Sequence, residues 1–242
     1  MMDKDNYQHH ISQQFNKDLT AVRNHLMEMG GLVEKQAADS LDALLKGDTG
    51  MAENVLKVED RINKLEMMID EECSRIIVLR QPAASDLRMI VAISKAVADL
   101  ERIGDESAKI ARMAIQLAEE GESPRGYVEA RHIGAHVRRM LHDALDAFAR
   151  FDVDKAVEVA AEDDQVDLEY RSAMRSLVTF MMEDPRSITR VLNVMWTLRS
   201  LERIGDHARN ICEQVVYLVQ GKDVRHITSE KMQEEVRKPG KR

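Results

Sequence analysis

The hexapeptide LERIGD occurs twice in the chain and carries acidic side chains in a pattern that suits a bound cation. On a helix, Glu101 and Asp105 lie four residues apart and therefore on the same face, and Glu202 and Asp206 repeat this arrangement. Two like charges at this spacing destabilise an isolated helix by about 0.2–0.5 kcal/mol. A hard metal ion prefers carboxylate oxygens and would turn the repulsion into attraction.

A second acidic cluster lies on the segment that precedes each LERIGD copy. In the second half of the chain, Asp163 and Asp167 are again four residues apart, and the corresponding positions in the first half are Glu59 and Asn63. The amide oxygen of Asn63 can coordinate a metal, although it brings no negative charge. If the two segments of each half pack with these pairs facing each other, each half presents several oxygen ligands.

The same spacing also fits ordinary ion pairs along a solvated helix edge. Asp105 is within reach of Lys109, and Asp206 is within reach of Arg209. Spacing alone leaves the metal site and the ion-paired edge open as alternatives.

Other candidate ligands have weaker patterns. Glu66 and Asp70 are four residues apart but have no counterpart pair in the second half, so we interpret them as solvated surface. His132 and His136 have a spacing that can chelate a metal, yet no HExxH motif accompanies them, and a polar start of a helix explains them more simply. His207 directly follows Asp206 and points away from it on a helix.

Helices must position these motifs. The chain has only 11 Gly and 4 Pro in 242 residues, and Pro82, Pro124 and Pro185 each stand in a short polar stretch that interrupts a helix. Between these breaks, apolar residues recur at spacings of three and four. The pattern predicts six helices, over 12–46, 51–79, 86–119, 127–150, 153–182 and 187–220.

An internal repeat determines the expected fold. LERIGD at 100–105 recurs at 201–206, and the segment around Leu41 and Asp48 recurs around Leu145 and Asp152. Because short loops favour antiparallel neighbours, each half is expected to be an up-down-up bundle. We therefore predict an all-α protein built from two tandem, sequence-related three-helix bundles: 10–120, 126–220 and, after them, a flexible C-terminal tail at 221–242.

Composition narrows the classes of function. Lys and Arg number 35 against 43 Asp and Glu, a net charge of -8, which argues against nucleic acid as a partner. Cys73 and Cys212 have no CxxC spacing and fit a reducing compartment. The polar start and the lack of a long apolar run predict a soluble, cytoplasmic protein. No P-loop, GxGxxG or GxSxG motif is present. The Glu-x-x-His motif of di-iron bundles fails at both LERIGD copies, because Glu101 and Glu202 are followed three residues later by Gly104 and Gly205.

With its two LERIGD copies, the stretch QPAASDLR at 81–88 and GDHARNI at 205–211, the chain resembles the PhoU family. The resemblance implies two similar three-helix bundles, commonly in a homodimer, whose [ED]xxxD motifs bind iron, zinc, manganese or magnesium. Asn63 departs from the acidic pattern, so the first site has one negative charge fewer. The remaining ligands implied by the resemblance are Glu101, Asp105, Glu202, Asp206, Asp163, Asp167 and Glu59.

The resemblance also implies a role. Members of the family act as negative regulators of the phosphate (Pho) regulon and as accessory proteins of the phosphate-specific ABC importer. They contact the ATPase subunit of the transporter and the sensor histidine kinase, and reach the membrane only through these partners. A non-enzymatic adapter is thus expected. The alternative is a metal-dependent phosphoester hydrolase whose carboxylate cluster activates water, but the missing histidine ligands and the absence of a Lys or Arg clamp motif disfavour it.

Overall fold

The computed structural model describes residues 4–121 and 127–238, and within these ranges every regular element is helical. The predicted all-α architecture of two tandem three-helix units is confirmed, and a further short helix follows the sixth. The elements, in chain order, are α1 (Lys4–Lys46), α2 (Thr49–Arg80), α3 (Ala84–Glu119), α4 (Tyr127–Arg150), α5 (Val153–Glu183), the 3₁₀ turn η1 (Pro185–Ser187), α6 (Ile188–Gln220) and α7 (Ser229–Arg237).

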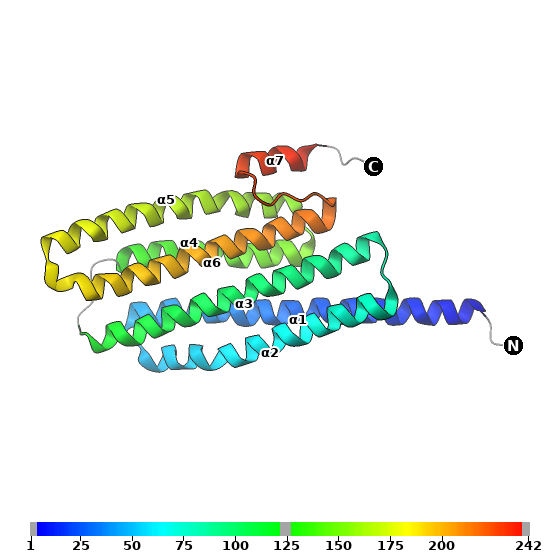
Figure 1. Cartoon of the computed structure of the whole chain (residues 1–242), viewed down its shortest axis with the longest axis horizontal. Helices are drawn as coiled ribbons and strands as arrows, with labels where there is room; N and C mark the ends of the chain where they lie inside the picture. The colour runs from blue at the N-terminus through cyan, green and yellow to red at the C-terminus, as the bar shows by residue number, and fades with distance from the viewer. Residues whose placement is uncertain (1–3, 122–126, 239–242) are drawn as a thin grey trace.

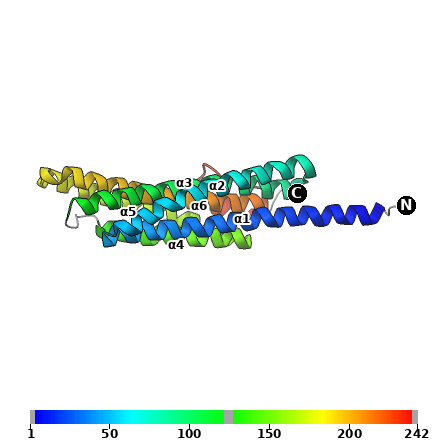
Figure 2. The ribbon, with the colours of Figure 1, turned by 90° about the horizontal axis from the view of Figure 1, so that it is seen from below.

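The six long helices form two layers. In Figure 1 the front layer runs in the order α2, α3, α6, α5, and α1 and α4 lie behind it; Figure 2, turned by 90°, shows α1 and α4 together on one side. The two halves meet where α3 packs on α6 and where α1 packs on α4. Each of α3 and α6 therefore contacts three other long helices, and these two helices carry the LERIGD motifs through the centre of the molecule.

The repeat predicted from the sequence appears again in the turns. Asp48 caps α2 by accepting a hydrogen bond from the amide of Met51 at 2.9 Å, and Asp152 caps α5 by accepting one from Lys155 at the same distance. The residues before the two caps, Gly47 and Phe151, both have positive φ, at 64° and 58°. A capping aspartate in β conformation thus starts the middle helix of each half.

The contact between α1 and α4 is reciprocal. A Cβ atom placed on Gly134 of α4 would lie 2.5 Å from Cδ2 of Leu41 on α1, and one placed on Gly30 of α1 would lie 2.8 Å from Cδ2 of Leu145 on α4. Each helix therefore inserts a leucine over a glycine of the other. The missing side chains allow the two halves to approach closely at two equivalent points.

The structure differs from the sequence expectation at both ends of the described chain. Helix α1 begins at Lys4 rather than at residue 12. The segment predicted to be a flexible tail, 221–242, contains α7, which packs on α5. Val224 and Met232 are each only 1% exposed, and Ser229 donates a hydrogen bond to Asp164 at 2.7 Å. Two apolar anchors and a polar contact hold this segment against the second half, and the sparse apolar pattern of the sequence did not reveal them.

Within the described ranges, no helix combines the length and the apolar character that crossing a membrane requires.

The glycine contacts give a test of the packing between halves. Gly134→Ala is expected to destabilise the fold by about 1–3 kcal/mol, because the new methyl group overlaps Leu41 in a well-packed contact. Gly31→Ala is the matched control, since a Cβ there meets nothing within 4 Å, and it is expected to stabilise the helix by about 0.5–1 kcal/mol. Chemical denaturation of both variants measures the difference, and equal effects would contradict the packing argument.

Candidate functional site

The LERIGD motifs lie in the middle of α3 and α6, and their glycines face the middle helix of the same half. A Cβ on Gly104 would lie 3.4 Å from Cδ1 of Ile62 on α2, and one on Gly205 would lie 3.4 Å from Oδ1 of Asp163 on α5. Each glycine therefore allows its helix to approach the middle helix closely. In the second half the glycine also leaves open space beside a carboxylate oxygen.

The predicted second-half site is assembled by the fold. Asp163 and Asp167 come from α5, Glu202 and Asp206 come from α6, and the two helices pack together. Asp163 is 5% exposed and Glu202 is 7% exposed, so both carboxyl groups are largely removed from water. Four acidic groups thus share one partly dry surface, at which charge is costly unless a cation compensates it.

The pKa values reflect this crowding. Burial, followed by the charge of Asp206, raises the pKa of Asp163 to about 6 and that of Glu202 to about 7. Burial also raises the pKa of Asp206, and the charge of Asp167 adds to the effect. One oxygen of Glu202, Oε2, is buried without a hydrogen-bond partner. The positive charge within the structure therefore compensates this site only in part.

Arginines compensate part of the second-half cluster, but not in the pairs expected from the sequence. Asp163 pairs with Arg209 at 3.3 Å. The same arginine also pairs with Glu213 and donates a hydrogen bond to the carbonyl of Ile227, and these contacts hold it beside Asp163. The predicted pair between Asp206 and Arg209 is accordingly absent, and Asp206 has no hydrogen bond or ion pair to any described residue.

The other two carboxylates of this cluster bind arginines of their own helices. Asp167 pairs with Arg171 at 2.7 Å, and Glu202 accepts a hydrogen bond from Arg199. Both arginine side chains are substantially exposed. These pairs lie at the edge of the site, where exposed ion pairs contribute little to stability.

The first-half site has different members from those predicted. Burial raises the pKa of Glu101, and the charges of Asp105 and Glu66 raise it further. Burial raises the pKa of Glu66 as well, followed by the charges of Asp70 and Asp105. On α2, Glu66 is partly exposed and lies near the carboxylates of the α3 motif, whereas Asp70 is exposed and accepts a hydrogen bond from Ser94 of α3 at 2.9 Å.

The two α2 positions that the repeat selected as ligands, Glu59 and Asn63, have different surroundings. Glu59 pairs with Arg112 of α3 at 3.0 Å, and Asn63 is exposed. Lys109, expected to pair with Asp105, binds Glu106 at 2.9 Å, so that expectation is wrong too. The signal that could have identified Glu66 and Asp70 was present, since they have the same four-residue spacing as the other pairs. What it lacked was a counterpart in the second half.

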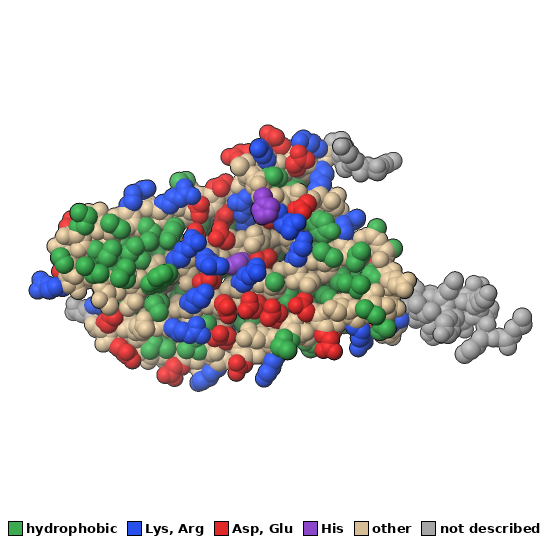
Figure 3. Space-filling model, in the orientation of Figure 1, with side chains coloured by type: hydrophobic (Ala, Val, Ile, Leu, Met, Phe, Trp, Pro, Cys, Tyr) green, Lys and Arg blue, Asp and Glu red, His purple; other side chains and the backbone are tan. Residues whose placement is uncertain are grey.

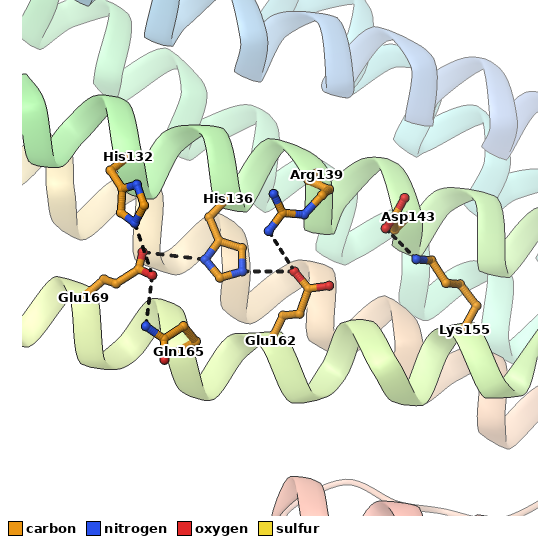
Figure 4. Close-up of polar contacts among 8 residues, drawn as sticks. All are labelled: His132, His136, Arg139, Asp143, Lys155, Glu162, Gln165 and Glu169. Atoms are coloured by element: carbon orange, nitrogen blue, oxygen red, sulfur yellow. Dashed lines mark hydrogen bonds and ion pairs between the residues drawn. The ribbon is translucent and has the colours of Figure 1, made fainter.

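The histidines of α4 take part in ion pairs with α5 (Figure 4). Nε2 of His136 lies 3.0 Å from Oε2 of Glu162, and its Nδ1 lies 3.6 Å from Oε2 of Glu169. His132 lies 3.5 Å from Oε1 of Glu169. Acidic partners far away in the sequence thus explain this pair, and the contacts join α4 to α5 along the outer side of the second half.

In the described part of the chain, no three His, Cys, Asp or Glu side chains stand ready in an arrangement that could hold a metal ion. The acidic clusters do have the right chemistry, because carboxylate oxygens are the ligands of hard cations. In the second half, Asp167 and Glu202 would have to leave their exposed arginines before they could act as ligands. The residues fit a cation that is bound with side-chain rearrangement.

Comparison with known proteins gives a consistent result. A family model described as the PhoU domain matches twice, at residues 26–114 and 130–215. The "Phosphate-specific transport system accessory protein PhoU homolog" of Pseudomonas aeruginosa is 64% identical over 236 residues, which are 98% of each chain. The "Phosphate-specific transport system accessory protein PhoU" of Escherichia coli (strain K12) is 46% identical over 96% of this chain and 95% of that protein.

Two solved structures have the same fold. The crystal structure of PhoU from Pseudomonas aeruginosa matches with a TM-score of 0.85 and 64% identity, covering 86% of this chain and all of that one. The crystal structure of the phosphate transport system regulatory protein PhoU from Streptococcus pneumoniae matches with a TM-score of 0.80 and 32% identity, covering 87% of this chain and 99% of that one.

The raised pKa of Glu202 predicts a pH-dependent stability. Because folding raises the pKa from 4.5 to about 7, the folded state holds the proton more tightly than the unfolded state, and stability falls as the pH rises through this range. In chelator-treated protein, Glu202→Gln is therefore expected to increase the free energy of unfolding at pH 8 by about 1–3 kcal/mol and to have little effect at pH 5.

Denaturant titrations across this pH range measure the effect. Glu59→Gln is the matched control, because Glu59 takes part in a partly exposed ion pair with Arg112; the change expected for it is a loss of at most about 1 kcal/mol. If Glu202→Gln changed the free energy of unfolding equally at pH 5 and pH 8, folding would not raise the pKa of Glu202.

Proposed function

The chain belongs to the PhoU family, and from that premise we propose that it is a negative regulator of the phosphate regulon and an adapter of the phosphate-specific ABC importer. In this role it relays the state of the importer, through the ATPase subunit of the transporter, to the sensor histidine kinase. When phosphate is plentiful, the adapter keeps the kinase from activating its response regulator.

One observation carries the proposal. A protein named as an accessory protein of the phosphate-specific transport system is 64% identical to this chain over 98% of both sequences. The match covers both halves of the chain.

The relatives are named as accessory or regulatory proteins, and the chain is accordingly an accessory protein of this family and not an enzyme. This excludes the phosphoester hydrolase that the carboxylate clusters left open as the alternative.

The surface of the second half supports the idea of a protein that binds other proteins. Trp196 and Met182 are 64% and 80% exposed, and the exposed apolar side chains near them, at the end of the molecule where α5 meets α6, are Val178, Ile188 and Leu192. Figure 3 shows apolar side chains gathered at this end of the front face. A contiguous apolar patch of this kind marks interaction sites.

A cytoplasmic homodimer that reaches the membrane only through its partners is part of the proposal.

The proposal includes metal ions at the acidic edges of α3 and α6. Glu202 and Asp206 are the α6 ligands in the second half, facing Asp163 and Asp167 of α5. In the first half we propose Glu66 and Asp70 of α2 in place of Glu59 and Asn63, beside Glu101 and Asp105 of α3; the mutual effects of Glu66, Glu101 and Asp105 on their pKa values support this choice. Oxygen-only ligand sets favour magnesium, manganese and ferric iron over zinc. A bound cation would compensate the charges that otherwise raise one another's pKa.

The regulatory role is tested by complementation. In an Escherichia coli strain that lacks its own PhoU, phosphate-starvation promoters are expected to be active even in phosphate-rich medium, and expression of this chain is expected to restore repression. A reporter driven by such a promoter measures the outcome, with the native E. coli protein as positive control and an empty vector as negative control. Continued activity of the reporter at matched expression would count against the proposal.

The composition of the first metal site is tested separately. Glu66→Gln is expected to lower metal binding in the first half by at least about tenfold, because it removes a charged ligand, whereas Glu59→Gln is expected to leave it unchanged. Calorimetry with Mn²⁺ on chelator-treated protein, in a background of Glu202→Gln and Asp206→Asn that removes the second site, measures the difference. Loss of binding in Glu59→Gln alone would restore the site expected from the repeat.

A further inference from the structure

A cavity of about 790 Å³ opens between α3 and α6, where the two halves meet. Six of its lining residues are basic, Lys95, Arg102, Arg199, Arg203, Arg209 and Arg225, and four are acidic, Asp99, Asp163, Asp206 and Glu213. In Figure 3 basic side chains gather around histidines near the centre of the front face, over α3 and α6. The chain as a whole has a net charge of -8, so a local excess of basic side chains indicates a site that attracts anions.

Most of the acidic groups in this groove, which we call the α3–α6 groove, are already compensated. Asp99 accepts hydrogen bonds from His207 at 2.9 Å and from Asn210 at 3.0 Å. Asp163 and Glu213 both pair with Arg209, at 3.3 and 3.6 Å. The negative charges in the floor of the groove therefore bind protein donors, which leaves them little capacity to attract the remaining cations.

Two of the cations at its mouth have weak partners within the chain. Arg102 approaches Asp99 only to 3.8 Å, and its side chain is 57% exposed. Lys95 lies over the ring of Tyr217, 5.3 Å from its centroid, and forms no ion pair with a described residue. Both belong to α3, and Arg203 faces them from α6, where its Nε also pairs with Glu106 of α3 at 3.1 Å. Donors from the two halves thus border one space.

His207 supplies an independent indication of a ligand. Its side chain lines the groove and is only 8% exposed. Because Asp99 accepts the proton of Nδ1, the other ring nitrogen, Nε2, points elsewhere, and this atom is buried without a hydrogen-bond partner in the described structure. Buried polar atoms are nearly always satisfied, and an unsatisfied one needs an explanation. Because Nδ1 carries the proton, Nε2 offers a lone pair, and a ligand in the groove with a hydroxyl donor, such as a monoprotonated phosphate group, would provide the missing partner.

We propose that the α3–α6 groove binds a small, phosphate-bearing anion. Arginine and lysine side chains form charge-assisted hydrogen bonds with phosphate oxygens, and Arg102, Lys95 and Arg203 stand where such bonds can form together. The groove is larger than a single phosphate group requires, so it also admits a short polyphosphate or a nucleotide. Because its walls come from both halves, the bound anion would cross-link them. This inference goes beyond the adapter role and requires no bound metal.

The test uses the full-length protein after removal of metal by a chelator, at low ionic strength, so that a metal-bridged anion is excluded. Calorimetry and thermal shift are measured with inorganic phosphate, tripolyphosphate, ATP and, as a carboxylate, citrate. At least one of the three phosphate-bearing anions is expected to bind and to raise the melting temperature. The one that binds most tightly identifies the class of ligand.

Arg102→Gln and Lys95→Gln are each expected to weaken the binding about tenfold, because each removes a charge-assisted donor. Arg131→Gln is the matched control, since Arg131 is exposed on α4 and outside the groove. It changes the net charge equally and is expected to bind as the unmodified protein does. Equal melting temperatures of all variants without the anion show that their folds are intact.

Three results would overturn the proposal. The first is no binding of any phosphate-bearing anion at millimolar concentration. The second is an equal loss of binding in Arg131→Gln, which would indicate a non-specific effect of charge. The third is binding only to citrate or only to vesicles containing phosphatidylglycerol, which would assign the groove to a different ligand. The complementation assay is independent of these measurements, so failure here leaves the adapter role untouched.

Discussion

The packing of α3 against α6 is the contact on which the rest of the structure depends. These helices occupy the centre of the front layer, touch three other long helices each, and bring the two halves together. Close packing there is helped by small side chains, and Ala92 and Ala96, which lie on the same side of α3 as Asp99, are buried with exposed fractions of at most 1%. The hydrogen bond between His207 of α6 and Asp99 of α3 adds a polar link across the same contact.

The function proposed for the acidic motifs opposes the stability of the fold. Carboxyl groups crowd along the contacts between α3 and α2 and between α6 and α5, and burial together with mutual repulsion raises their pKa values. Crowding of like charge costs free energy when nothing compensates it. Such arrangements are therefore typical of functional sites. The tight apolar core around the motifs, which includes Ile103 and Ile204, holds these groups in place.

The two halves repeat the fold more faithfully than the sites. The capping aspartates and the glycine–leucine contacts correspond pair by pair. The acidic residues of the middle helices do not correspond. Asp163 lies near Asp206 of the second motif, whereas Glu59, at the matching position of the first half, pairs with Arg112. The carboxylate of α2 that lies near the first motif is that of Glu66. Seven residues, about two turns of α2, separate Glu59 from Glu66. Two halves with the same backbone can therefore place carboxylates at different positions along the middle helix, and these carboxylates can still lie near the LERIGD motif.

The sequence by itself determined the helices, the two-fold organisation and the four carboxylates of the LERIGD motifs. These features rest on local spacing: apolar periodicity selects helices, proline ends them, and residues four apart share a helical face. It did not determine which side chains of neighbouring helices meet. The choice of Glu66 over Glu59, the diversion of Arg209 to Asp163, the acidic partners of His136 and the docking of α7 all depend on how far one helix slides along another. That register is decided by packing between segments distant in the chain, and only the tertiary structure contains it.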